Sequence, residues 1–463
     1  MKLKKDDLLL NTLIAIFWVV SLFGFFRDEL IPSLSNVETY FFAAVDGVVL
    51  FLGVATIKRR IHLLLVGLFL ALAFVTTMII NGLGLIFFLN GLRDFVGLLF
   101  MPVVYYWIWS KETCRKRFIN RFDKHLTLWL IIQFPCIVWQ FAHWGACDKV
   151  GGSLGNFMSG LDSTLIYMVS FYLLRKRLKN YQNIWQGVLD NIWLVLLVLP
   201  TFLNETKVSF IYLIMYFLLL LPIDRKIFVR SLVIFPVLSL MIYVGWGMYM
   251  SSQSSFGYNF FSSENLVEYI YVDDVDEVES NAKYAENYES SGSDVPRVTK
   301  LVFFFLFEND YPGCTLHGMG LAQFKGGTTL EPTKFFNENE WVLTGTIPFF
   351  YSIAVQLGLL GVAWYVLFLV FTFTKSPFKK NIHDWNLQFY VIAVFLILLV
   401  YSDMQRIVTF NIFVFYIIAC SWKEPLENSE DANEPNDDEI IAVGDNSVVG
   451  LTNKTIDKAN PQK

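Results

Sequence analysis

Long apolar runs are the feature of this sequence that most limits its fold. The first, LLLNTLIAIFWVVSLFGFF at residues 8–26, is followed by many others of similar length. About 20 apolar residues in a helix are enough to cross the hydrocarbon core of a bilayer, and a helix satisfies its own backbone polar groups there. Only 17% of the residues are charged, against roughly 25% in soluble domains. We therefore predict an all-α, polytopic integral membrane protein.

The apolar runs predict about twelve transmembrane helices. They cover residues 8–26, 39–57, 62–82, 93–109, 125–145, 160–175, 185–203, 206–223, 229–250, 346–374, 386–402 and 405–422. This divides the chain into helices one to nine within residues 1–250, a large loop at 251–345, helices ten to twelve within 346–422, and a tail at 423–463. The tail contains ENSEDANEPNDDE, an acidic composition typical of disordered segments.

Basic residues are concentrated in alternate connections between the predicted helices. These connections carry KRR at 58–60, KETCRKRFINRFDK at 111–124, RKRLK at 175–179, DRK at 224–226 and KSPFKK at 375–380. Connections rich in Lys and Arg face the cytoplasm. We therefore predict that both termini are cytoplasmic and that the large loop lies outside.

Charged residues at the outer ends of the predicted helices are candidates for function. Three cations, Arg93, Lys207 and Arg406, lie on the outer side, although most Lys and Arg residues in the connections are predicted to face the cytoplasm. Glu205 lies close to Lys207 in sequence, and Asp162 is at the start of the sixth helix. Ionisable residues at membrane depth are costly and often functional. Each one could be a local ion pair or a charge that reaches the interface. Taken together, the three cations suit an anionic ligand such as a pyrophosphate.

The second half of the large loop adds further candidates. PRVTKLVFFFLFENDYPGCTLHGMGLAQFKGG places Arg297 and Lys300 on an apolar, helical stretch before a glycine-rich turn. His317 in that turn could accept a proton from a sugar hydroxyl, and a structural role for a single histidine stays open. The nearby carboxylates are alternatives for the same role: Glu308, Asp310, Glu338 and Glu340. The glycines would allow a close approach to a ligand, or simply form turns.

The sequence gives no sign of a metal or cofactor site. Its five cysteines lack the spacing of metal ligands, and we predict neither a metal nor a cofactor. Cys147 and Cys314 both fall in predicted outer segments, where they could form a disulfide or remain separate thiols. We expect the lipid bilayer as a partner, and no nucleic acid.

Four stretches, in order, resemble the bacterial O-antigen ligase and O-antigen polymerase superfamily of membrane glycosyltransferases. GGSLGNFMSGLDSTL is similar to a Gly-rich start of a middle helix, and PTFLNETKVSFIYLIMYFLLLL is similar to a hairpin whose cation, here Lys207, opens an apolar helix. PRVTKLVFFFLF with LHGMGLAQF resembles the arginine-bearing helix and GxG turn of the family's large loop. VQLGLLGVAWYVLF resembles its following Gly-x-x-Gly helix.

The resemblance implies a GT-C-like enzyme of the bacterial plasma membrane whose active site faces outward. It implies transfer of a glycan from a polyprenyl-pyrophosphate donor to a sugar hydroxyl of a second lipid-linked repeat, in the biosynthesis of O-antigen, capsule or exopolysaccharide. Arg297 and Lys207 would hold the pyrophosphate, with Arg93, Glu205, Lys300, Arg406 and Asp162 as further binding residues and His317 as the base. A chain-length regulator is a further expected partner.

Two other functions stay open. A ligase would transfer finished chains to lipid A core or another acceptor, but the histidine that ligases place before the last motif is replaced here by Gly345, Thr346 and Ile347. This departure favours the polymerase. A lipid-linked oligosaccharide flippase would also use many helices and buried charges, although the sequence lacks the two similar halves of many transporters.

Overall fold

The computed structural model describes residues 2–145, 147–204, 206, 208–220, 295–325, 331–373 and 385–422. In these residues the secondary structure is helical, with no strand. The all-α prediction is therefore confirmed for the described part of the chain. The acidic tail and the predicted ninth helix, residues 229–250, lie outside the described residues.

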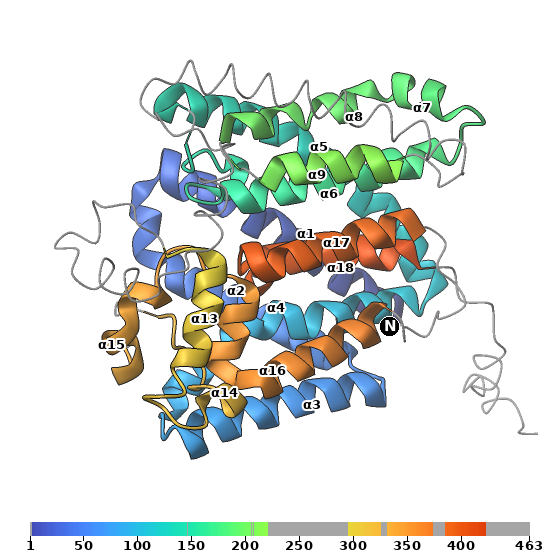
Figure 1. Cartoon of the computed structure of the whole chain (residues 1–463). Helices are drawn as coiled ribbons and strands as arrows, with labels where there is room; N and C mark the ends of the chain where they lie inside the picture. Colours follow the sequence, from blue (N-terminus) through green and yellow to red (C-terminus); the bar gives the residue numbers. More distant parts are fainter. Residues whose placement is uncertain are drawn as a thin grey trace, which may run out of the picture. The chain divides into compact units, whose positions relative to one another are not determined.

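The described helices fall into two stretches of sequence (Figure 1). The first contains α1 (Lys2–Phe25), α2 (Glu38–Thr56), α3 (Arg60–Phe74), α4 (Leu85–Trp109), α5 (Glu112–Trp144), α6 (Ser159–Leu178), α7 (Ile184–Asp190), α8 (Ile192–Leu196) and α9 (Val208–Leu220). The second contains α13 (Arg297–Leu306), α14 (Cys314–His317), α15 (Lys334–Leu343), α16 (Phe349–Phe373), α17 (Trp385–Tyr401) and α18 (Val408–Ser421). Short 3-10 or π-helical turns link several of them: η1 (Phe26–Leu30), η2 (Pro32–Val37), η3 (Val75–Ile80), η4 (Gly152–Leu154), η5 (Leu199–Asn204) and η6 (Met404–Arg406).

Six helices in the described residues are long and apolar enough to cross a membrane. They are Asp6–Leu30, Pro32–Thr56, Arg60–Ile80, Leu85–Trp109, Glu112–Trp144 and Phe349–Thr372. A seventh span is formed if the bent pair Ile184–Asp190 and Ile192–Asn204 crosses as one, and three shorter apolar helices follow at Val208–Leu220, Asn386–Tyr401 and Val408–Ser421. By length and composition this is a helical membrane protein. The total of twelve spans stays a prediction.

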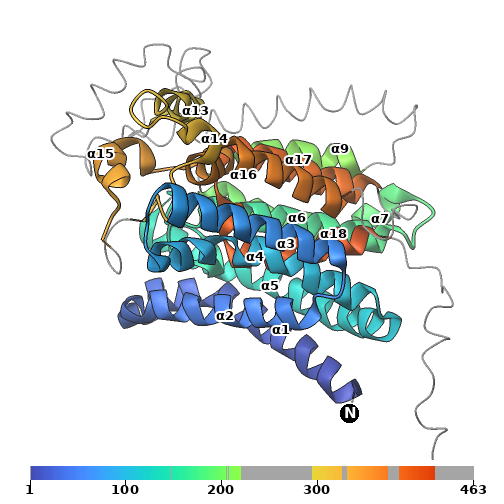
Figure 2. The ribbon, with the colours of Figure 1, turned by 90° about the horizontal axis from the view of Figure 1, so that it is seen from below.

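Helices α4 and α18 pack against one another and against most of their neighbours. α4 also contacts α2, α3 and α5, whereas α18 contacts α1, α6 and α17. Every residue of α18 from Val408 to Ala419 is buried, as expected for a helix that is apolar on all sides. Tyr105 of α4 donates a hydrogen bond to the Ile412 carbonyl at 2.7 Å. Figure 2 shows α3 beside α16, where Trp364 donates to the Leu65 carbonyl at 2.9 Å.

Two predicted helices differ from those observed. The fourth was predicted at residues 93–109, but α4 begins at Leu85, so Arg93 and Asp94 lie inside the helix rather than at its opening. The seventh was predicted as one helix over 185–203, but it is divided into α7, α8 and η5 with a bend of 67°. The bend follows Asn191, whose amide donates back to the Gly187 carbonyl at 2.9 Å and so competes with regular helix geometry.

The described end of the large loop has a hydrophobic core of its own. Phe303, Phe304 and Phe307 of the α13 region pack with Phe335, Trp341 and Val342 of α15 and with Tyr351 of α16. The apolar stretch that follows Arg297 is therefore explained by packing against α15 and α16. This core fixes the position of α13, and with it that of Arg297, on the helices.

Candidate functional site

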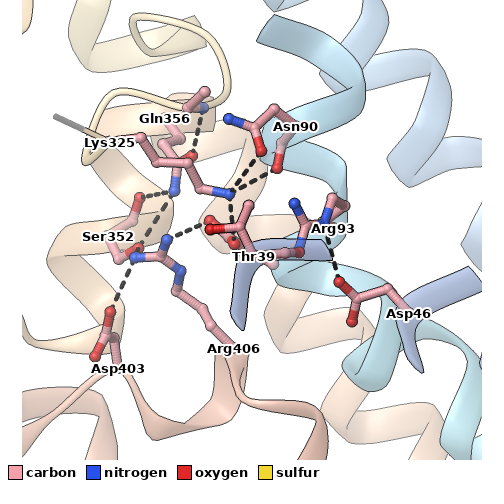
Figure 3. A network of polar contacts seen from close by, with 11 residues as sticks. Thr39, Asp46, Asn90, Arg93, Lys325, Ser352, Gln356, Asp403 and Arg406 are labelled. Carbon is pink, nitrogen blue, oxygen red and sulfur yellow. Dashed lines mark hydrogen bonds and ion pairs between the residues drawn. The ribbon is translucent and has the colours of Figure 1, made fainter. Parts of the chain in front are cut away.

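A network of partly buried charges joins α4, the loop after α14 and the turn after α17 (Figure 3). The Asp94 carboxylate forms ion pairs with Arg406 and with the Lys325 ammonium, whose Nζ lies 2.9 Å from Oδ1. Arg406 also lies 2.9 Å from the Asp403 carboxylate and 3.3 Å from Ser352 Oγ. Burial lowers the pKa of Lys325 although Asp94 attracts its charge. Three segments far apart in sequence are thus held together by opposite charges.

Arg93, one residue before Asp94, belongs to a separate ion pair. Its Nε lies 3.0 Å from Asp46 Oδ2, and its Nη2 lies 3.4 Å from the Thr39 carbonyl. Asp46 lies in the middle of α2, which is one of the helices long enough to span a membrane. The pair therefore joins α2 to α4 (Figure 3), and the charge of Arg93 is matched within the fold.

Arg297, at the start of α13, lies against the end of α17. Its Nε donates to the Tyr401 carbonyl at 3.0 Å, and its guanidinium lies 4.7 Å from the centroid of the Tyr401 ring. Tyr401 lies close to Gly160 in the first turn of α6. This chain of contacts brings Arg297 to the start of α6, so two of the four motif segments meet here.

The hairpin before α9 reaches the same place. Asn204, fully buried, donates to Ser163 Oγ at 2.9 Å and to the Ser159 carbonyl at 3.3 Å, both in the first turns of α6. Tyr212 of α9 lies 3.3 Å from Thr164 Oγ1. Glu205 and Lys207 lie outside the described residues. The residues on either side of Lys207, Thr206 and Val208, are both buried.

We call this meeting of segments the convergence region. It comprises the first turns of α6, Asn204 and Thr206 of the hairpin, the start of α9, Arg297 and the turn at residues 401–406. Met404 contributes its sulfur, 3.7 Å from Thr164 Oγ1, which joins α6 to the turn that also carries Arg406. The charge network and the convergence region therefore share the residues of this turn.

Asp162 is placed in the first turn of α6, where it is fully buried. Neither of its carboxylate oxygens has a hydrogen-bond partner among the described residues. One oxygen lies against Gly152, as does the amide oxygen of Gln133; Gln133 is itself tied to Ser153 by bonds of 2.7 and 2.8 Å. A buried charge without donors is unfavourable, and unsatisfied buried groups often mark functional positions.

The glycine-rich turn packs on α16 instead of forming an open ligand loop. Met319 and Gly320 donate their amide hydrogens to the Val355 and Gln356 carbonyls at 2.8 and 3.0 Å. These carbonyls are available because α16 is broken at Gly358, where φ is +64°. A Cβ at Gly358 would lie 2.2 Å from the Leu316 carbonyl oxygen. The two glycine motifs therefore fit against each other.

His317 is held by its own loop. Its Nδ1 lies 2.8 Å from the Gly318 carbonyl. Within the described part of the chain, no hydrogen bond or ion pair connects it to Arg297 or to the charge network. The structure thus leaves its role as the base a prediction, and it does not bring His317 together with Arg297.

Two other predicted residues have roles in the fold of the large loop. Lys300 is fully buried, and its Nζ donates to the Thr344 and Thr346 carbonyls at 2.7 and 3.0 Å, so it ties α13 to the segment before α16. Glu308 accepts hydrogen bonds from the backbone of Gly313 and Thr315 at 2.6 and 2.9 Å. These bonds lower the pKa of Glu308 to about 2, which makes it a weak base.

Other predictions about the site concern metals and cysteines. Among the described residues, no group of three His, Cys, Asp or Glu side chains is arranged to hold a metal ion. All five cysteines are free thiols. Cys147 and Cys314 are therefore separate, which resolves the alternatives that the sequence left open.

Two charged members of these networks, Asp46 and Lys325, were not predicted from the sequence. A carboxylate in the middle of the predicted second helix is itself a signal of function or pairing. Lys325 stood in the same glycine-rich turn as His317, and its charge on the outer side was the available clue. Their partners could not be predicted, since Lys325 and Asn90, whose carbonyl it contacts at 2.7 Å, are 235 positions apart.

No protein-family model, curated protein or solved structure matches this sequence.

Proposed function

We propose that the protein is a membrane glycosyltransferase that polymerises lipid-linked oligosaccharide repeat units on the outer side of a bacterial plasma membrane. The observation that carries this proposal is the convergence region. Segments that resemble three separate motifs of the ligase and polymerase superfamily meet there, although more than 90 positions separate Asn204 from Arg297 along the sequence. Two of those segments each supply a cation. Arg297 belongs to the region, and Lys207 is adjacent in sequence to Thr206 and Val208.

The reaction needs a leaving group to be stabilised and a proton to be removed. The acceptor hydroxyl oxygen attacks the anomeric carbon of the donor glycan, a new glycosidic C–O bond forms, and the bond from that carbon to the pyrophosphate breaks. The hydroxyl proton passes to a base, and the polyprenyl pyrophosphate leaves with the bonding electrons. Cations beside the pyrophosphate stabilise the charge that develops in the transition state.

Arg297 is the residue that we assign to the pyrophosphate. Its Nε bond to the Tyr401 carbonyl and its position over the Tyr401 ring fix the plane of the guanidinium. A planar guanidinium of fixed orientation is suited to two parallel hydrogen bonds to phosphate oxygens. Lys207 would add a second cation from the hairpin.

Arg93 and Arg406 are better suited to positioning than to direct binding. Each one is paired with a carboxylate: Asp46 for Arg93, and Asp94 with Asp403 for Arg406. Their charges are neutralised within the protein, so an incoming pyrophosphate gains less from them. The network instead holds the turn at residues 401–406, and with it Tyr401 under Arg297.

The proposal is tested with the purified full-length protein, a lipid-linked single repeat and no nucleotide sugar. We expect longer lipid-linked glycans, visible as a ladder on a gel, with release of one polyprenyl pyrophosphate for each bond formed. If the protein extends nothing but transfers preformed chains to lipid A core, it is a ligase. If it moves the lipid-linked repeat across liposomes without changing its length, it is a flippase; either outcome overturns the proposal.

Variants locate the activity in the convergence region. We expect Arg297→Gln to lower the rate of extension at least 100-fold, since one charged donor to a developing anion accounts for roughly 10²–10³ in rate. Arg297→Lys should recover only part of the rate, and Lys207→Gln should also be strongly impaired. The matched control is Lys149→Gln, since Lys149 is also predicted to be outside and lies over the Trp144 ring. Equal rates for Arg297→Gln and the control would remove Arg297 from the site.

A further inference from the structure

The carboxyl group of Asp162, in the first turn of α6, is buried without a compensating charge in the described part of the chain. Its side chain is fully buried, and neither carboxyl oxygen has a hydrogen-bond partner among those residues. No charged side chain that the structure describes contributes to its electrostatic environment. An ionised carboxylate in such a position would cost several kcal/mol even after the protein relaxes around it.

The position of Asp162 in α6 does not offset this cost. A carboxylate in the first turn of a helix gains at most about 2 kcal/mol from the helix dipole. The free N–H groups of a first turn can also bind a side-chain oxygen, but the Asp162 oxygens accept no such bond within the described residues. The cost of burial is therefore the larger effect, and it favours a neutral, protonated carboxyl group.

An acceptor for that proton lies beside Asp162. Gln133 of α5 is only 1% exposed. Its Oε1 lies 2.5 Å, and Asp162 Oδ2 lies 2.6 Å, from the position that a Cβ of Gly152 would occupy. Because Gly152 has no side chain, both oxygens can approach this position. Two acceptor oxygens that approach the same position repel each other unless one of them carries a proton.

The orientation of the Gln133 amide is fixed by other contacts. Its Nε2 donates to Ser153 Oγ at 2.7 Å and to the Trp129 carbonyl at 3.3 Å. Its Oε1 accepts from the Ser153 backbone N–H at 2.8 Å. Exchanging the amide nitrogen and oxygen would place two donors against each other and lose these bonds. Gln133 therefore presents an oxygen beside Asp162, and one lone pair of that oxygen is left for a further donor.

A proton fits this position better than a metal ion does. Cations such as Ca²⁺ and Mg²⁺ take about six or more oxygen ligands, and in the described residues no three metal-binding side chains are grouped to hold an ion. The titratable group on which Asp162 acts is the Cys136 thiol of α5. A thiol is neutral at neutral pH, so Cys136 supplies no charge that could stabilise an ionised Asp162.

We propose that Asp162 is a proton-binding site, in which the protonated carboxyl group donates its O–H to Gln133 Oε1 at neutral pH. This bond joins the first turn of α6 to the middle of α5. Because the first turns of α6 belong to the convergence region, loss of the proton would place a carboxylate against the amide oxygen and separate this part of α6 from α5. The proposal does not depend on the proposed function.

The test is infrared difference spectroscopy of the purified full-length protein in a neutral detergent at neutral pH. A protonated carboxyl group has a C=O stretching band that is resolved from the bands of carboxylates and amides. We expect the parent protein to show such a band, shifted in deuterated water, and Asp162→Asn to lack it. A solvated aspartate has a pKa of about 3.9, so only about one in a thousand would be protonated at neutral pH. A parent spectrum without an Asp162-dependent band would show an ionised carboxylate and overturn the proposal.

Three further measurements identify what is bound. Asp123→Asn is the matched control: Asp123 is also partly buried but pairs with Lys176, so this substitution should leave the band in place. Asp162→Ser also removes the carboxyl group, and it replaces Asp162→Asn if that variant fails to fold. Replacing sodium chloride by choline chloride should not change the band. A band that appears only without sodium would show that the carboxylate holds a sodium ion, and a band at the frequency of an unbonded carboxyl group would refute the bond to Gln133.

Discussion

Asp94 of α4 and Arg406 of the turn after α17 form an ion pair although they are 312 positions apart in the chain. The second carboxylate oxygen of Asp94 is occupied by Lys325 from the large loop. One side chain therefore balances the charges of two segments that both pack against α4. Removing one partner of such a pair leaves the other charge without compensation in a largely desolvated site, which lowers the stability of the fold.

The first prediction concerns this pair. Asp94→Asn removes the negative charge and leaves Lys325 and Arg406 facing a neutral amide. We expect the free energy of unfolding to fall by about 3 kcal/mol or more, measured as a lower melting temperature in detergent. The matched control is Glu112→Gln, which breaks the exposed pair with Lys116 and should change stability by less than about 1 kcal/mol. Similar effects of the two substitutions would contradict the role given to Asp94.

The second prediction concerns the break in α16. Gly358→Ala places a Cβ where φ is positive and where the Leu316 carbonyl oxygen lies 2.2 Å away. The backbone conformation alone costs about 1–3 kcal/mol for a residue other than glycine, and the clash adds to this. We expect a lower melting temperature and faster proteolysis within residues 313–325. Gly67→Ala in α3, where a Cβ would meet no atom within 4 Å, should leave both measurements unchanged or slightly improved.

The third prediction concerns pH. Because the pKa of Glu308 is lowered to about 2 from an ordinary value of 4.5, its carboxylate stabilises the fold fully above pH 4.5. This contribution is lost as the pH falls from 4.5 through 2. The melting temperature of Glu308→Gln should therefore lie below that of the parent protein by a constant amount between about pH 5 and about pH 7. The gap should narrow below pH 4.5.

Asp310→Asn is the control for this experiment. Asp310 is exposed and its side chain makes no hydrogen bond within the described residues, so its replacement should leave the melting temperature nearly unchanged over the same pH range. A gap for Glu308→Gln that widens on acidification would show that the carboxylate is not the stabilising form.

The fourth prediction separates two carboxyl groups, the fully buried Asp162 and the partly buried Asp123. Asp162 has no hydrogen-bond partner in the described residues, so Asp162→Asn breaks no hydrogen bond and should leave the melting temperature nearly unchanged. Asp123 accepts bonds from two tyrosines, so Asp123→Asn should cost about 2 kcal/mol. If Asp162 binds substrate, its variant should also lose extension activity in spite of its stability. A marked loss of stability in Asp162→Asn would instead reveal a structural role.

The sequence was sufficient to predict most helices, because an apolar run of 20 residues carries its own signal. It was not sufficient for the start of α4, which begins at Leu85 and not at the predicted residue 93. Leu321 and Ala322 of the large loop lie directly against Gly91, a contact that only glycine allows. Local patterns cannot show such a neighbour from a distant part of the chain.

The candidate site could be predicted only in part, because the sequence shows which residues are charged but not which distant residues they contact. The charges at Arg93 and Arg406 were visible in the sequence, but Asp46 and Asp94, which pair with them, lie on helices distant in sequence. Lys300 was predicted to bind substrate because it is a cation near Arg297. Its two bonds to the Thr344 and Thr346 carbonyls show that a buried ammonium can also replace missing backbone donors in a loop.

The break in α16 has a consequence for movement. In an unbroken helix the Val355 and Gln356 carbonyls would accept hydrogen bonds from residues four positions later, but here they accept from Met319 and Gly320. Straightening α16 and releasing the glycine-rich turn would therefore be a single event. The same turn positions Lys325 beside Asp94, so that event would also break the Lys325–Asp94 ion pair. The helix, the turn and the charge network would therefore change conformation together.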